Sequence, residues 1–388
     1  MPVLKYSAKF DSVVPEQLGV GDSAIKDASS LLSNELKEAI DLAYDNIYKF
    51  HKAQFSEKLE VETTKGVLCW REKRPIESVG LYIPGGSAPL FSTVLMLGIP
   101  AMIAGCKEVV LCTPPAGKDG INPAILYAAQ RCGIQKVYQA GGIQAVAAMT
   151  FGTQTIPQVN KLFGPGNQYV TAAKEMATRY GLAIDMPAGP SELLVLADDS
   201  ADASFVAADL LSQAEHGPDS QVVLLSNSED LLMNVQKELE AQLDRLPRKD
   251  IASKAIDNSR LIFMENKEDI ANFINAYGPE HYILCVEDEA FYLDKLMNAG
   301  SVFIGNYTPE SAGDYASGTN HTLPTMGYTK QYSGVNLDSY LKSITFQKIS
   351  EEGIKNIGKT IEVMAEAEGL QAHKNAVSIR LKKLKEQK

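Results

Sequence analysis

The sequence predicts an α/β fold with two incomplete Rossmann-like domains, each built on a mainly parallel sheet, followed by a helical C-terminal appendage. Short apolar runs alternate with stretches of helical length between residues 79 and 304, which is the pattern of parallel strands joined by crossover helices. From residue 350 onward only helical stretches follow. In addition, 388 residues are too many for one hydrophobic core, so at least two domains are expected.

The first set of strands and helices lies before residue 190. We expect four strands here, at residues 79–83, 108–112, 136–139 and 161–163. The helices that follow them are expected at residues 90–104, 123–131 and 168–180. Connections of this length imply right-handed crossovers, and therefore a mainly parallel sheet.

A second set of strands and helices follows, with no internal repeat or obvious linker in the sequence. Its strands are expected at residues 193–196, 221–225, 261–264, 282–286 and 301–304. Asp199 or Ser200 can cap the helix after the first of these strands, and Gly217-Pro218 ends it. This helix would carry Gln213 and His216 on the same side of its last turn, where both side chains can reach one ion.

The tail consists of two predicted helical stretches joined near Gly369. Its basic end, residues 380–385, suits the negative pole of a helix and indicates a solvated helix end rather than a nucleic-acid patch.

Composition and charge exclude several classes of function. The net charge of −11 argues against nucleic acid or an anionic membrane as the main partner. No apolar run approaches the roughly 20 residues needed to cross a bilayer, and the start shows no signal-peptide pattern, so a cytoplasmic location is expected. The five cysteines form no C-x-x-C pair and are expected to be reduced and mostly buried; they are Cys69, Cys106, Cys112, Cys132 and Cys285.

Four of the five histidines lie close in sequence to a carboxylate or a carboxamide. The pairs are Gln213 with His216, Glu280 with His281, Asp314 with His321, and Glu368 with His373. Metal binding and proton transfer both require such groups. One pair alone is more often a solvated or capping pair, but four pairs among five histidines favour a functional site.

Glycine-containing turns suggest a nucleotide. Gly85-Gly86, Gly141-Gly142 and Gly164-Pro-Gly166 each follow an apolar run and precede a helix, where free N–H groups can face a pyrophosphate. The third turn has Tyr169 where the G-x-G-x-x-G fingerprint requires its last glycine. Ordinary tight turns therefore remain an open alternative, and a dinucleotide here would bind in a nonstandard way.

Seven motifs spread over nearly the whole chain resemble, in the same order, those of the histidinol dehydrogenase family. They are VGLYIPGGSAPL (79–90), FGPGN (163–167), GPSE (189–192), LLSQAEHG (210–217), GPEH (278–281), GDYASGTNH (313–321) and EGLQAHKNAV (368–377). The family usually has a few dozen more residues before the segment that corresponds to residues 5–11. Helices in that region would normally help a dimer to pack.

The resemblance implies an enzyme that oxidises L-histidinol to L-histidinal and then to L-histidine, using NAD twice and one Zn²⁺. The matching metal ligands are Gln213, His216, Asp314 and His373, of which the last would come from the other subunit of a domain-swapped homodimer. Two nitrogen and two oxygen donors suit zinc. The four ligands also match substrate-binding positions, together with Ser191, His281 and Glu368.

The resemblance also implies roles in proton transfer and NAD binding. Glu280 and His281 match the acid–base pair: a neutral imidazole can take the hydroxyl proton, and Glu280 can activate water for the aldehyde step. The NAD contacts match Tyr82, Gln144 and Asn167. The resemblance further implies three parts: a first Rossmann-like domain of residues 1–82 and 192–335, a second Rossmann-like domain of residues 83–191 that would bind NAD, and a helical tail of residues 336–388 that would support the dimer. Two histidines remain outside these roles: we expect His321 to be structural and His51 to be a surface helix residue.

Other functions remain possible from the sequence. A dehydrogenase of the same fold could act on another small alcohol, although the amine-binding position Glu368 argues against it. A zinc-binding protein without catalytic activity is the more distant alternative. Cys106 or Cys112 could form a thiohemiacetal, but neither has a base nearby in sequence.

Overall fold

The computed structural model describes residues 2–10, 13–85, 89–117 and 120–386. The chain divides into two units, which we describe separately. The first unit consists of residues 1–54 and 76–340, and the second of residues 55–75 and 341–388. Within the described ranges, every helix is too short or too polar to span a lipid bilayer.

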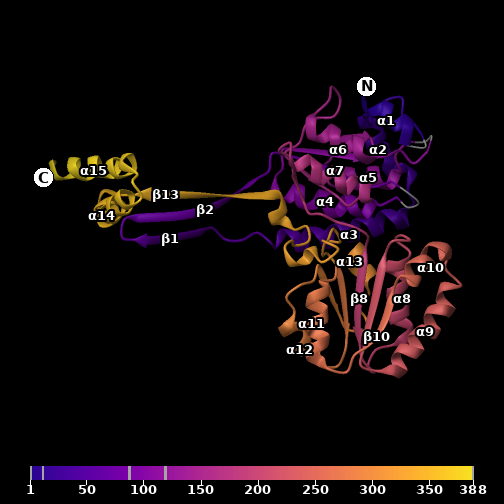
Figure 1. Cartoon of the computed structure of the whole chain (residues 1–388). Helices are drawn as coiled ribbons and strands as arrows, with labels where there is room; N and C mark the ends of the chain where they lie inside the picture. The colour runs from indigo at the N-terminus through magenta and orange to yellow at the C-terminus, as the bar shows by residue number, and fades with distance from the viewer. Residues whose placement is uncertain (1, 11–12, 86–88, 118–119, 387–388) are drawn as a thin grey trace. The chain divides into compact units, whose positions relative to one another are not determined.

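The first unit contains two five-stranded parallel sheets (Figure 1). One sheet has the order β5-β4-β3-β6-β7, with strands β3 (Ser78–Tyr82), β4 (Glu108–Thr113), β5 (Lys136–Gln139), β6 (Lys161–Phe163) and β7 (Ala183–Ile184). The other has the order β10-β9-β8-β11-β12, with strands β8 (Glu192–Ala197), β9 (Gln221–Ser226), β10 (Arg260–Phe263), β11 (His281–Cys285) and β12 (Ser301–Ile304). The strand order is the same in both sheets: the first strand is central, and the direction of winding switches between its first and fourth strands. Such a switch point opens a crevice at the carboxyl ends of the strands.

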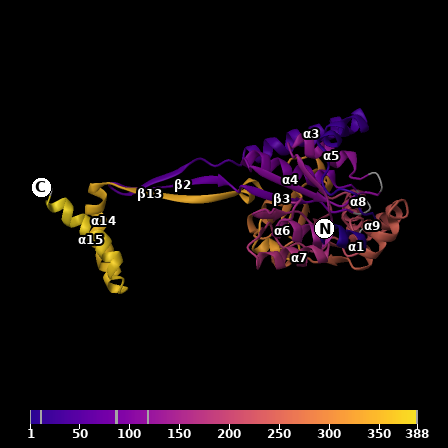
Figure 2. The ribbon, with the colours of Figure 1, turned by 90° about the horizontal axis from the view of Figure 1, so that it is seen from above.

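Helices cover both faces of the first sheet. They are α4 (Phe91–Ala104), α5 (Pro123–Arg131), α6 (Gly142–Phe151) and α7 (Gln168–Thr178). Figure 2 shows α4 and α5 on one side of β3, and α6 and α7 on the other. The segment before this sheet adds further helices to the unit: α1 (Pro2–Phe10), α2 (Asp22–Asp27), η1 (Ala28–Leu31) and α3 (Asn34–Lys52).

The central strands of the second sheet, β8, β9 and β11, are also buried on both faces. Alternate residues of β8 point to opposite sides, so Leu193 and Val195 join one hydrophobic cluster whereas Leu194 and Leu196 join another. The helices of this half are α8 (Ala203–Ala214), α9 (Glu229–Leu243), α10 (Lys249–Asp257), α11 (Lys267–Tyr277), α12 (Glu289–Lys295) and α13 (Glu310–Tyr315), with the short η2 (Tyr328–Lys330) and η3 (Leu337–Tyr340). α8 and α9 contribute to the first cluster, and α11 and α12 to the second.

The second unit combines an antiparallel sheet with two helices. Its sheet has the order β1-β2-β13, with strands β1 (Leu59–Thr64), β2 (Val67–Pro75) and β13 (Leu341–Ile349). The helices are α14 (Glu351–Ala367) and α15 (Gln371–Glu386), and Gly369 between them has a positive φ of 74°. The predicted helix break near Gly369 is confirmed.

Three details differ from the prediction. Asp202, not Asp199 or Ser200, caps α8: its side chain accepts hydrogen bonds from the N–H groups of the two residues that follow Ala203. β3 pairs with β4 and β6, so residues 78–82 belong to the sheet expected for residues 83–191, and the boundary after residue 82 is corrected to one before Ser78. β13 precedes the helices of the tail and was not expected, nor were β1 and β2.

Candidate active site

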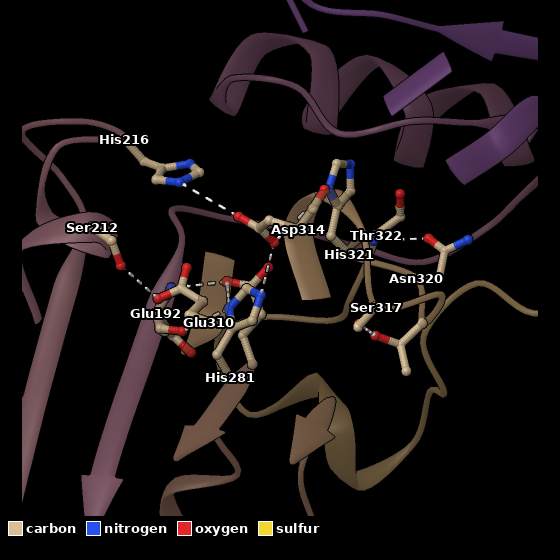
Figure 3. A network of polar contacts seen from close by, with 12 residues as sticks. Glu192, Ser212, His216, His281, Glu310, Asp314, Ser317, Asn320, His321 and Thr322 are labelled. Carbon is tan, nitrogen blue, oxygen red and sulfur yellow. Dashed lines mark hydrogen bonds and ion pairs between the residues drawn. The ribbon is translucent and has the colours of Figure 1, made fainter. Parts of the chain in front are cut away.

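The candidate active site lies at the amino ends of two neighbouring strands of the second sheet (Figure 3). Glu192 and His281 are the first residues of β8 and β11, which pair in parallel, so their amino ends share one edge of the sheet. α13 contributes Glu310 and Asp314, which are four residues apart and therefore near one face of the helix. The end of α8 and the residues after it complete the cluster.

His281 is almost completely buried among acidic groups. Its Nδ1 lies 3.6 Å from a carboxylate oxygen of Glu280 and 3.3 Å from the backbone oxygen of Glu192. Its Nε2 lies 3.7 Å from Asp314 and has no hydrogen-bond partner among the described residues. Burial alone would lower the pKa of His281, but the charge of Glu280 and the carboxylate of Asp314 raise it well above its ordinary value. The ring therefore presents an unpartnered buried nitrogen, as a proton-transfer group requires.

Glu280 is fixed by the start of the neighbouring strand. Its Oε2 accepts a hydrogen bond of 2.8 Å from the backbone N–H of Glu192, and the residue is 6% exposed. The side chain of Glu192 in turn accepts a hydrogen bond of 3.0 Å from the N–H of Met326. Burial raises the pKa of Glu192 to about 7. The backbone N–H of Glu192, at the amino end of β8, thus orients the carboxylate of Glu280, which is the predicted acid–base partner of His281.

Gln213 and Glu310 form a buried contact between α8 and α13. Gln213 is fully buried near the end of α8, and with its amide turned so that the nitrogen faces α13 it donates to the carboxylate of Glu310. The hydroxyl of Ser212 lies 3.4 Å from the same carboxylate. Burial raises the pKa of Glu310 to about 8. Glu310 was not among the predicted site residues.

His216, Glu310 and Asp314 offer a donor set for a cation. One ligand atom from each lies within 4.8 Å of the others, and His216 Nε2 is 3.8 Å from Asp314 Oδ2. Burial alone would raise the pKa of Asp314, but His281, His321 and His216 together lower it, so its carboxylate is charged at neutral pH. One imidazole and two carboxylates, with the Gln213 amide beside them, suit a zinc ion. The residues present therefore fit the expected metal.

The helix end differs from the prediction in one respect. α8 stops at Ala214, so Gln213 occupies its last turn but His216 lies beyond it, in the turn before Gly217. The N–H of His216 still bonds to the backbone oxygen of Gln213, at 3.2 Å. His216 is half exposed whereas Gln213 is fully buried, so the two side chains do not share one face of a continuous helix.

Of the two remaining histidines of the first unit, His51 is buried and His321 is partly buried. His321 Nδ1 lies 3.0 Å from the backbone oxygen of Asp314, and its Nε2 lies 3.1 Å from the hydroxyl of Thr93. These contacts hold the backbone of Asp314 against α4. His51 was expected on the surface, and that prediction was wrong: it is 0% exposed and its Nδ1 lies 2.9 Å from the oxygen of Ile47. It occupies the buried stripe of α3 with Ile40, Ala43 and Ile47, and burial lowers its pKa.

The three predicted NAD contacts gather at the carboxyl ends of the first sheet. Tyr82 is the last residue of β3, and its hydroxyl accepts a hydrogen bond of 3.1 Å from the N–H of Gly142 at the start of α6. Gln144 is buried in the first turn of that helix. Asn167 caps α7 after the turn that begins at Gly164. These positions surround the switch point between β3 and β6, whereas the expected turn at Gly85-Gly86 lies partly outside the described residues.

The other predicted substrate residues fall in different places. Ser191 immediately precedes β8, is partly buried, and accepts a hydrogen bond of 3.1 Å at its backbone oxygen from Gln221. Glu368 and His373 belong to the second unit. Glu368 follows α14, His373 lies in the first turn of α15, and both are exposed.

The cysteine alternative gains no support. Burial raises the pKa of Cys106 to about 12, and burial also raises the pKa of the fully buried Cys112. A nucleophilic cysteine needs the opposite shift, because the thiolate is the reactive form. Neither thiol is therefore prepared to attack an aldehyde.

Sequence reasoning missed Glu192 and Glu310, although a signal for each is present. Glu192 closes the GPSE motif, and Glu310 precedes Asp314 by the four residues that join positions on one helix face. What the sequence lacks is the helix itself: α13 has only six residues and no apolar periodicity to reveal it.

Comparisons with known proteins identify the family to which this chain belongs. The family model for histidinol dehydrogenase matches residues 1–381. The histidinol dehydrogenase of Bacteroides thetaiotaomicron is 57% identical over 383 residues, which are 99% of this chain and 90% of that protein. The crystal structure of histidinol dehydrogenase from Elizabethkingia anophelis has a TM-score of 0.96 at 60% identity, covering 99% of this chain and 88% of that one. An acetylating aldehyde dehydrogenase from Geobacillus thermoglucosidasius, with a TM-score of 0.54 at 14% identity and coverage of 84% and 88%, shares the fold alone. The chain therefore belongs to the histidinol dehydrogenase family.

Proposed function

We propose that this chain oxidises L-histidinol through L-histidinal to L-histidine, with NAD as the oxidant and one Zn²⁺ in the site. The family assignment supports the reaction. The observation that carries the chemistry is the buried, unpartnered Nε2 of His281 beside the donor set of His216, Glu310 and Asp314. A proton-transfer group and a cation site thus lie side by side, as the oxidation of a bound amino alcohol requires.

The chain's own ligands for the metal are Gln213, His216 and Asp314. His373, from the second unit of a partner subunit in a domain-swapped homodimer, is the proposed fourth ligand. When bound, zinc holds the imidazole and amine of the substrate and so serves as a template. Glu310 keeps the Gln213 amide in place through its hydrogen bond, which fixes a ligand that would otherwise rotate.

Two residues outside the metal set complete substrate binding. Ser191 stands at the start of β8 beside Glu192 and contributes its hydroxyl. Glu368, again from the partner subunit, offers a carboxylate to the cationic amine of histidinol. A small alcohol without an amine would leave Glu368 without a partner, which disfavours the alternative substrates.

Proton transfer falls to the pair at the amino ends of the strands. In its neutral form, His281 takes the hydroxyl proton of the substrate when NAD accepts the hydride, and the neighbouring carboxylates that raise its pKa stabilise the imidazolium that results. Glu280, oriented by the Glu192 N–H, activates the water that adds to the aldehyde. Tyr82, Gln144 and Asn167 position the NAD at the carboxyl ends of the first sheet.

The test is turnover by purified, zinc-loaded protein. We expect two NADH per L-histidinol consumed and one per L-histidinal, with L-histidine as the product in both cases. Other small alcohols at the same concentration serve as the control for the alternative dehydrogenase. Absence of NADH formation with L-histidinol from folded, zinc-containing protein would overturn the proposal.

A further inference from the structure

Lys174 of α7 and Asp185 after β7 form a buried ion pair that no step of the proposed chemistry uses. The ammonium nitrogen lies 2.6 Å from Asp185 Oδ1, and the two side chains are only 4% and 1% exposed. By contrast, the cation is 23% exposed in the pair Lys374–Glu366 and 36% exposed in the pair Arg131–Asp41. A buried pair costs desolvation that its attraction often fails to offset, so stability alone is a weak reason for it.

Two further hydrogen bonds of the pair converge on one residue, Gly164. Lys174 donates to the backbone oxygen of Gly164 at 2.7 Å, and the N–H of Gly164 donates to Asp185 Oδ2 at 2.8 Å. Asp185 Oδ1 also accepts from the N–H of Met186, at 2.8 Å. Both polar groups of one glycine are thus held by charged side chains, which make stronger hydrogen bonds than neutral ones.

The backbone at Gly164 has no freedom to accept a side chain. Its φ is +124°, and a Cβ placed there would lie 2.0 Å from the backbone oxygen of Tyr82. Gly164 therefore packs directly against the end of β3, at the switch point of the first sheet. Three residues later Asn167 caps α7, and two turns into that helix the chain reaches Lys174 itself. The side chain of Lys174 in α7 thus contacts Gly164, in the turn that precedes the same helix.

We propose that Lys174 and Asp185 are positioning residues for NAD: they clamp Gly164 so that the turn of residues 164–167 presents its backbone and Asn167 to the dinucleotide. This inference rests on the proposed NAD site at Tyr82, Gln144 and Asn167. The charge of Lys174 is matched by Asp185, so the pair acts through the shape of the turn and not by attracting phosphate. Its loss should weaken NAD binding and leave the catalytic edge of the second sheet intact.

The test compares Lys174→Met with the double variant Lys174→Met/Asp185→Asn. The double variant removes the pair without leaving a buried unpaired charge, and so keeps the test valid if the single variant does not fold. The matched control is Lys161→Met: Lys161 is a neighbouring lysine on β6 whose ammonium donates to the backbone oxygen of Ser339, at 2.8 Å, and not to Gly164.

Two readouts are measured on protein whose folding is verified by circular dichroism. We expect the double variant to raise the KM for NAD at least fivefold, while kcat at saturating NAD and the KM for histidinol change less than twofold. Calorimetric titration of metal-free protein with NAD should show the same weakening without turnover, and the amide of Gly164 should exchange its hydrogen faster. Lys161→Met should match the wild type in each measurement.

The outcomes separate the two proposals. An unchanged affinity for NAD in the folded double variant would refute the positioning role. A similar rise in the KM values for NAD and for histidinol, together with a similar fall in kcat, would also refute it, because that pattern indicates general damage to the structure. If wild-type protein neither binds NAD nor reduces it, the proposed function itself fails before the variants are compared.

Discussion

Replacement of Glu310 by glutamine should stabilise the metal-free protein, and increasingly so as the pH rises. The Glu310 carboxyl is 1% exposed, and burial raises its pKa to about 8 from an ordinary value of 4.5. The folded chain therefore holds a proton that the unfolded chain releases above pH 4.5. When folding raises the pKa of a carboxyl group, the free energy of unfolding falls as the pH rises from the unfolded-state pKa toward the folded-state pKa.

The size of the effect follows from the two pKa values, since each pH interval of 1 between them corresponds to about 1.4 kcal/mol. Glu310→Gln has no proton to lose, so it should exceed the wild type in free energy of unfolding by about 1 kcal/mol at pH 5.5 and about 3 kcal/mol at pH 7. At pH 8.5 the difference should reach about 5 kcal/mol and then level off. Glutamine retains a carbonyl oxygen that can accept the hydrogen bond from Gln213.

The assay is thermal and urea unfolding of chelator-treated protein across this pH range. The control is Glu240→Gln, which changes an exposed carboxyl of α9 and should leave the pH dependence as in the wild type. A Glu310→Gln variant whose advantage is absent, or constant between pH 5.5 and 8.5, would show that the carboxyl of Glu310 is not kept protonated by burial.

Three further outcomes concern the metal, the proton transfer and the assembly. Chelation should abolish activity and Zn²⁺ restore it, and His216→Ala should lose most of its zinc; one zinc per chain in that variant by elemental analysis would contradict the ligand assignment. His281→Asn should slow oxidation of histidinol, and Glu280→Gln should slow oxidation of histidinal more, each by about 10²- to 10⁴-fold; equal losses on both substrates for both variants would defeat this division. Subunit exchange between His373→Ala and His216→Ala proteins should restore activity through one native site per heterodimer, and no recovery in verified heterodimers would rule out a shared site.

Elements with local signals could be predicted from the sequence. The helix at residues 123–131 was predicted with the bounds of α5. In the structure Asn122 caps this helix, and Pro123 occupies its first position, which suits proline. The strands at 136–139 and 301–304 were likewise predicted with their observed bounds. Short apolar runs between polar turns are enough to mark buried parallel strands.

The second unit lacked such signals. All six residues of β1 are exposed, so no alternation of apolar and polar side chains marks it as a strand. β13 pairs with β2 although the two are separated by more than half of the chain, and no local pattern records such a pairing. The sequence reveals the helices α14 and α15 but not the sheet that precedes them.

Within the site, residue types were easier to predict than burial. Glu280 and His281 could be recognised because a carboxylate and an imidazole are adjacent in the sequence. The structure places Glu280 Oε2 3.6 Å from His281 Nδ1. His51 was misjudged because a histidine between charged residues looks solvated, whereas its position in the stripe of α3 is what buries it. Helical spacing should therefore be weighed before polarity when a histidine is assigned to a surface.

The proposed NAD contacts lie at the carboxyl ends of the strands in the first sheet, whereas the proposed acid–base pair lies at the amino ends in the second sheet. The carboxyl ends of the second sheet therefore carry none of the proposed site residues. In the second sheet the reactive side chains begin β8 and β11, so the turns that follow these strands lie a full strand length away, roughly 16 Å for six residues. The turn of residues 198–202 is one of these, and its Asp199 is exposed. An affinity tag, a fluorophore or an immobilisation linker grafted there would report on the protein without entering its working surface.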